Sequence, residues 1–131
     1  MDSLLDLLTI PAYVAAKGLP GPIVDGQVYG GVVMGIGQAL SEGTQLDADG
    51  RHRNPHLTDY KLVTASDAPQ IDIAWIETDT PNAGPKGSKG VGEPPCVPTA
   101  GAIANAIAKV VGNRVRQLPM TPERVWEARP G

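Results

Sequence analysis

The sequence predicts an α+β fold, and three observations indicate it. Two segments have the apolar spacing of helices, at 25–42 and 99–111. A β-branched and apolar run between them, at 71–77, is typical of a strand. A short helix is expected from residue 121 onward. The expected order is helix, hairpin, strand, loop, helix, strand and helix: mixed strands with two main packed helices and a short C-terminal helix.

The composition indicates a loop-rich chain with few large side chains. The 131 residues have the length of one domain, and they include 16 glycines, 13 prolines and no phenylalanine. Because aromatic residues normally dominate the energetics of a core, the core here must be built from Val, Ile, Leu and Ala. We expect such a chain to complete its packing against another molecule.

Charge and patterning exclude several classes of protein. The formal net charge of −3 provides no basic surface for nucleic acid. No apolar run approaches the ~18 residues of a membrane span, and Asp2 and Asp6 stand where a signal peptide carries positive charge. The single cysteine, Cys96, excludes an intramolecular disulfide. We therefore expect a cytoplasmic protein with neither a nucleic-acid nor a membrane partner.

The first long helix is expected over 25–42, with Asp25 as its N-cap. Its predicted apolar stripe consists of Tyr29, Val33, Ile36 and Leu40. Five glycines lie in the same segment: 26, 30, 31, 35 and 37. Each glycine costs a helix about 1 kcal/mol relative to alanine. Either they allow close contact with a neighbouring helix or sheet, or the N-terminal turn with Gln27 meets a polar ligand.

A hairpin is predicted over 44–53, with its turn at 47–50. The aspartates of this turn do not form a calcium loop, because His52 occupies the position that requires glycine. His52 and His56 have the spacing of a metal pair, but Asn54-Pro55 interrupts any helix between them. No metal site is expected there.

The loop at 84–95 combines four glycines with one carboxylate held before two prolines, Glu93. It matches neither the Walker pattern nor the dinucleotide pattern G-x-G-x-x-G. Its amides, with Lys86 and Lys89, could hold an anion near the start of the next helix. Glu93 is either a general base, if apolar surroundings raise its pKa, or a structural acid that accepts backbone amides. Cys96 is interpreted as a structural thiol, since no histidine is expected nearby.

The C-terminal part has clear helix boundaries. Gly112 is expected to end the second long helix, and 114–118 is a candidate strand. Thr121, Pro122 and Glu123 are the N-cap, the first residue and the first-turn acid of a last helix.

Several sequence motifs follow one another along the chain. They are Asp25-Gly26-Gln27-Val28-Tyr29-Gly30-Gly31, Met34-Gly35-Ile36-Gly37-Gln38-Ala39-Leu40, Leu57-Thr58-Asp59-Tyr60, Lys89-Gly90-Val91-Gly92-Glu93-Pro94-Pro95, Ala102-Ile103-Ala104-Asn105-Ala106-Ile107 and Leu118-Pro119-Met120-Thr121-Pro122-Glu123. Together they resemble the C-terminal segment of the molybdopterin-binding large subunit of molybdenum hydroxylases, the group of xanthine dehydrogenase, aldehyde oxidase and carbon monoxide dehydrogenase. The resemblance assigns 22–131 to that segment, and 1–21 to an N-terminal extension that is not family-like.

The resemblance implies an oxidoreductase that oxidises an aldehyde, an N-heterocycle or a similar small molecule with oxygen derived from water. It implies that Glu93 is the general base. It also implies that Gln27 hydrogen-bonds the cofactor, and that Ser88, Lys89, Gly90, Val91 and Gly92 pack against the pterin. The cofactor would be molybdopterin, in its cytosine dinucleotide form, shared with other parts of the large subunit. Iron–sulfur clusters and FAD would be on partners, and no side chain of this chain would ligate the metal.

A family large subunit is several times longer than this chain, and Tyr29 stands where many members carry an acid. The chain is therefore expected to act only with the remainder of the large subunit or with other subunits of the complex. The alternative is a truncated, non-catalytic remnant or interaction domain that keeps the fold without cofactor. The substrate would be selected mainly by side chains outside this segment.

Overall fold

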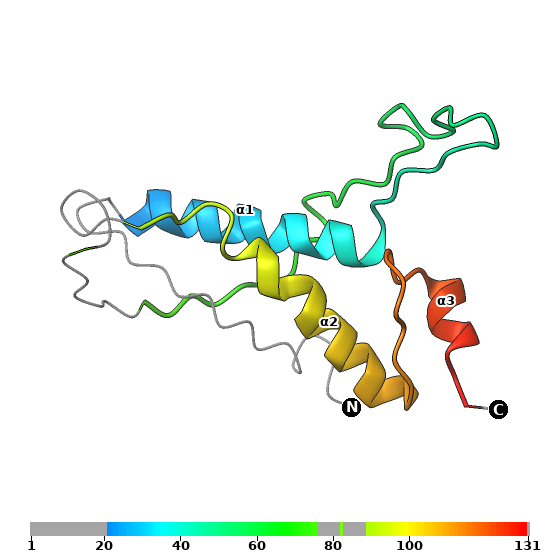
Figure 1. The fold of residues 1–131 in the computed structure, drawn as a ribbon. Coiled ribbons are helices and arrows are strands. Elements are labelled where there is room, and N and C mark those ends of the chain that lie inside the picture. Colours follow the sequence, from blue (N-terminus) through cyan, green and yellow to red (C-terminus); the bar gives the residue numbers. More distant parts are fainter. Residues whose placement is uncertain (1–20, 76–81, 83–88, 131) are drawn as a thin grey trace.

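The computed structural model describes residues 21–75, 82 and 89–130, and contains three helices in this part of the chain (Figure 1). These are α1 (Gly21–Leu40), α2 (Cys96–Val111) and α3 (Pro122–Glu127). In Figure 1, α2 starts beside the middle of α1 and runs obliquely away from it, and α3 lies to the right of α2, across the segment that connects the two helices. None of these helices is long and apolar enough to cross a membrane. The two long packed helices and the short C-terminal helix are as predicted.

The predicted strands are not formed in the described part of the chain. The residues described in the two candidate segments, 71–75 and 114–118, join no ladder there, and the β contact that is present is an isolated antiparallel bridge between Leu46 and His52. A strand requires a paired neighbour, whereas 71–75 runs alongside α1 (Figure 1). The last residues of the strand predicted at 71–77, residues 76–77, lie outside the described residues.

Helix α1 begins at Gly21 rather than at Asp25. Pro22 fits this start, because a helix needs no amide hydrogen in its first turn. The prediction of Asp25 as N-cap is wrong: its carboxylate accepts a hydrogen bond from Nε1 of Trp75 at 3.0 Å. Asp25 therefore ties the segment 71–75 to α1.

The buried side of α1 differs from the predicted stripe. The buried valines are Val24, Val28 and Val32, and they pack against Ile71, Ile73, Val91 and Ile36. Tyr29, placed in the predicted stripe, is 44% exposed. Because α1 carries apolar residues on every side, its spacing is compatible with more than one buried face.

Helix α2 and the C-terminal segment form a second cluster. Ile103 and Ile107 of α2 pack with Ala39 of α1 and with Met120, and Ile36 contacts this cluster as well as the first. The end of α2 is as predicted: Gly112 is left-handed (φ 87°), and its amide donates to the carbonyl of Ala108. Thr121 also caps α3 as predicted, since its hydroxyl accepts the Arg124 amide.

Residues 41–70, which we call the arm, project from the C-terminal end of α1 (Figure 1). The arm contains the predicted turn: Oδ1 of Asp47 accepts the amides of Asp49 (2.9 Å) and Arg51 (2.8 Å), and Gly50 has φ 77°. The Tyr60 hydroxyl donates to Glu42 at 3.1 Å, and this bond to the carboxylate raises the pKa of Tyr60. The arm is thus hydrogen-bonded within its turn and at its base.

Replacing Asn54 by alanine is expected to loosen the arm. Asn54 is 8% exposed, accepts from the Gln45 amide at 2.8 Å and donates to the Gly43 carbonyl at 2.7 Å. Leaving such buried groups unpaired costs about 1–3 kcal/mol. Hydrogen exchange at 43–54 should accelerate in Asn54→Ala, while exchange in α2 stays unchanged. Asn54→Asp keeps only the acceptor and should also accelerate exchange; unchanged exchange in both variants would contradict this role.

Candidate functional site

The loop that precedes α2 and the first turn of α2 lie directly on α1, because Gly31 and Gly35 leave room for them. A Cβ atom added to Gly31 would lie 3.0 Å from the carbonyl oxygen of Gly92 and 3.0 Å from Cβ of Pro95. A Cβ added to Gly35 would lie 2.5 Å from Cβ of Thr99. The interpretation of close packing is therefore confirmed at Gly31 and Gly35.

Gln27 and Gly92, two of the predicted cofactor residues, are neighbours. A Cβ added to Gly92 would lie 3.0 Å from Oε1 of Gln27. Gln27 is four residues before Gly31, so the two residues share one side of α1. The close approach at Gly31 thus places the loop backbone beside the amide side chain of Gln27.

Glu93 follows immediately, with its side chain exposed. Its carbonyl accepts the Cys96 amide at 2.9 Å, and Pro94 and Pro95 form the turn that leads into α2. The backbone of Glu93 is therefore held both by this bond and by proline geometry. The apolar surroundings considered for its carboxylate are not provided by the described residues, which leave the side chain open.

The rest of the predicted cofactor loop is divided between core and surface. Val91 is half-buried against the Val24–Val28–Val32 cluster, so its side chain anchors the loop to α1. Lys89 and Gly90 are exposed. Ser88 lies outside the described residues.

Cys96 is a half-buried free thiol at the start of α2, 3.6 Å from Oε1 of Gln38. His52 belongs to the arm, where it forms the bridge with Leu46. Within the residues that the structure describes, no group of three His, Cys, Asp or Glu side chains could hold a metal ion.

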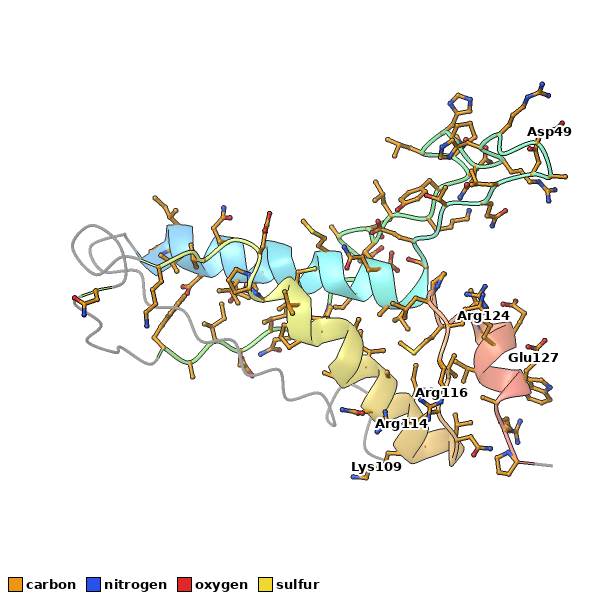
Figure 2. The ribbon with its side chains drawn as sticks, viewed as in Figure 1. Asp49, Lys109, Arg114, Arg116, Arg124 and Glu127 are labelled. Carbon is orange, nitrogen blue, oxygen red and sulfur yellow. The ribbon has the colours of Figure 1, made fainter. Side chains whose placement is uncertain are left out.

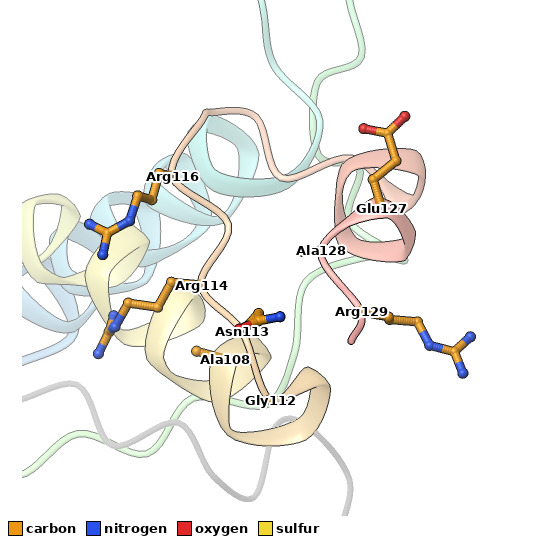
Figure 3. Close-up of a pocket in the computed structure, with 8 residues that line it drawn as sticks. All are labelled: Ala108, Gly112, Asn113, Arg114, Arg116, Glu127, Ala128 and Arg129. Carbon is orange, nitrogen blue, oxygen red and sulfur yellow. The ribbon is translucent and has the colours of Figure 1, made fainter. Parts of the chain in front are cut away.

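An open groove of about 630 Å³ lies at the other end of α2, where it faces α3 (Figure 3). Its lining residues are Ala108, Gly112, Asn113, Arg114, Arg116, Glu127, Ala128 and Arg129. Figure 3 shows Arg114 and Arg116 pointing to one side and Arg129 to the other, away from the space between the helices. A helix of 16 residues is about 24 Å long, so this groove is remote from Glu93.

The cations near this groove have a local explanation. Figure 2 shows Lys109, Arg114 and Arg116 around the C-terminal end of α2. Positive charge is favourable at that end of a helix, and Nη1 of Arg114 also donates to Oδ1 of Asn105 at 2.8 Å. Arg129 lies 4.4 Å from the ring centroid of Trp126. The candidate site is therefore the region around Gln27, Gly92 and Glu93, where two of the residues singled out in the sequence are neighbours.

Comparison with known proteins identifies the family that this chain resembles. Residues 20–69 match the family model described as the molybdopterin cofactor-binding domain. The chain corresponds to a segment of the molybdenum-binding large subunit of molybdenum hydroxylases, as the motifs predicted.

Individual relatives show how much of such a subunit is present. The chain is 45% identical over 106 residues to the putative xanthine dehydrogenase molybdenum-binding subunit of Escherichia coli, covering 80% of this chain and 14% of that subunit. It is 39% identical over 105 residues to the aldehyde oxidoreductase of Megalodesulfovibrio gigas, covering 11% of that protein. The crystal structure of quinoline 2-oxidoreductase from Pseudomonas putida 86 matches with a TM-score of 0.79 and 32% identity, over 88% of this chain and 15% of that one. The chain thus spans a small part of the relatives that it matches.

Proposed function

We propose that this chain supplies the general base and part of the cofactor-facing surface of a molybdenum hydroxylase. The observation that carries the proposal is the juxtaposition of Gln27 with Gly92, one residue before Glu93. Two motifs distant in the sequence, each of which the family resemblance links to the cofactor, lie together here. We assign this role to 22–131 and regard 1–21 as an extension.

The residues present fit a molybdopterin cofactor. No described heavy atom lies within 4 Å of a Cβ placed on Gly90, apart from its chain neighbours, and a Cβ at Gly92 would crowd Gln27. Glycine backbone can approach a ligand closely and direct amides to it. The amide of Gln27, the backbone of 89–92 and the side chain of Lys89 would hold the cofactor. When bound, the cofactor would supply the two-electron redox chemistry.

The proposed role of Glu93 is to accept a proton at its carboxylate. A base must be held in one orientation relative to the proton that it takes, and Pro94 and Pro95 restrict its backbone. The exposed side chain faces outward from this chain. Exclusion of water from the carboxylate would therefore come from other parts of the subunit.

The proposed substrate is a small molecule with an electron-poor carbon, such as an aldehyde or an N-heterocycle. Relatives of both kinds are known by name, among them the nicotine 6-hydroxylase large subunit of Paenarthrobacter nicotinovorans and the aldehyde oxidoreductase of M. gigas. The proposed partners are the remainder of the large subunit and subunits that carry iron–sulfur clusters and FAD. The cytosine dinucleotide form of the cofactor is part of the same proposal.

Purification of the tagged chain, expressed together with its neighbouring genes, tests the proposal. We expect it to co-purify with longer chains and with molybdenum, measured by elemental analysis, and cytosine dinucleotide, measured by mass spectrometry. A monomeric chain free of metal under these conditions would contradict the catalytic role. It would support the alternative, an interaction domain that keeps the fold without cofactor.

A further inference from the structure

Helix α1 has an apolar side that the described residues do not cover. Among its 20 residues the only charged one is Asp25, which bonds Trp75. Val24, Val28 and Val32 bury one side, whereas Ile23 is 57% and Met34 53% exposed on the opposite side. A helix that is apolar all round is found in the interior of a large protein or in a membrane. The exposed side of α1 therefore has the character of a buried surface.

Two glycines lie between these exposed residues. Ile23, Gly26, Gly30 and Met34 follow helical spacing, and we call them the outer face of α1. Apart from its chain neighbours and the helix's own backbone, no described atom lies within 4 Å of a Cβ placed on Gly26 or Gly30. Gly31 and Gly35, by contrast, are required by contact with the loop and α2. Each helical glycine costs about 1 kcal/mol relative to alanine. Close packing explains the glycines at 31 and 35, whereas no packing within the described chain explains those at 26 and 30.

We propose that the outer face of α1 docks an apolar segment of the remainder of the large subunit, whose backbone approaches α1 at Gly26 and Gly30. This inference rests on the proposed function. The E. coli relative has 86% of its length outside the matched part, since the chain covers 14% of it. That remainder offers the buried environment that an apolar helix requires. Gln27 adjoins Gly26, so the docked segment would also border the candidate site.

The test uses a defined probe: the E. coli molybdenum-binding subunit lacking the segment that this chain matches. Co-expression with the tagged chain should yield a complex. Gly30→Leu should weaken retention of the probe at least tenfold, because leucine would occupy the space for the approaching backbone. Leucine is a better helix former than glycine by roughly 0.5–1 kcal/mol, so the isolated variant should be at least as stable as wild type.

Gly101→Leu is the matched control, because Gly101 is an exposed glycine of α2 that also has no described neighbour within 4 Å of a Cβ. It should leave retention unchanged. Equal binding by wild type and Gly30→Leu overturns the proposal, and so does a failure of the wild-type chain to bind. If sedimentation shows a dimer of the chain that Gly30→Leu dissociates, the occupant is a second copy and the proposal is also wrong.

Molybdenum content separates this inference from the proposed function. A complex that depends on Gly30 but holds no molybdenum would support the docking surface and contradict the catalytic role. A complex that holds molybdenum and forms equally well with Gly30→Leu would support the catalytic role and contradict the docking surface.

Discussion

Glu93→Gln is expected to lower kcat of the active complex by at least about a hundredfold while molybdenum and pterin remain bound. Glutamine has nearly the shape of glutamate, but it cannot accept the proton that a general base takes. General acid–base catalysis typically contributes 10²–10⁴-fold to a rate. Because the backbone at Glu93 is held by Pro94, Pro95 and the Cys96 amide, the substitution should leave the loop in place.

Steady-state kinetics and metal analysis on the same preparation measure this effect. Glu127→Gln serves as the control, because Glu127 is an exposed carboxylate on α3 at the groove remote from the site. Its kcat should equal that of wild type. Near-normal turnover in Glu93→Gln with full cofactor content would remove Glu93 from the role of base.

Gly35→Ala is expected to destabilise the chain by about 1–3 kcal/mol, the usual cost of overpacking a tight contact. The added Cβ would lie 2.5 Å from Cβ and 2.9 Å from Cγ2 of Thr99, and 3.0 Å from the carbonyl oxygen of Cys96. Thr99 is fully buried, and its hydroxyl donates to the Pro95 carbonyl at 2.8 Å. Thr99 therefore has no space to move into, and α2 must shift away from α1.

The midpoint of urea unfolding, followed by circular dichroism, measures this loss. Gly101→Ala is the control: its Cβ meets open space, so it should gain roughly 0.5–1 kcal/mol from helix propensity. The opposite signs of the two glycine-to-alanine changes identify packing as the cause. A Gly35→Ala variant at least as stable as wild type would show that α1 and α2 are not in close contact.

The helices could largely be predicted from local signals. Gly112 and Thr121 mark helix ends through their own backbone and side-chain chemistry, and both behave as predicted. The start of α1 could not be predicted in this way, because Asp25 bonds Trp75, a residue distant in the sequence. The strand predicted at 71–77 depends on a pairing partner, and none is found in the described part of the chain.

The buried face of α1 illustrates a different limit. Apolar spacing identifies the buried face of a helix only when the other faces are polar. In α1, apolar residues occur both on the buried face that contains Val24 and on the face that contains Tyr29. The candidate site was predicted from the family motifs, and the structure places Gln27 beside Gly92. The side chain of Val91 packs against the Val24–Val28–Val32 cluster. The spacing of residues along the loop does not predict this contact.

The position of Ile36 between two hydrophobic clusters affects how the chain unfolds. Ile36 contacts the cluster beneath the Gln27–Gly92 site and also the cluster that holds Met120 and Val125. Loosening of either cluster removes contacts from the same side chain, so the two halves are coupled and should melt in a single transition. Damage at the C-terminal end, far from Glu93, would thus reach the site by lowering the fraction of molecules in which it is assembled.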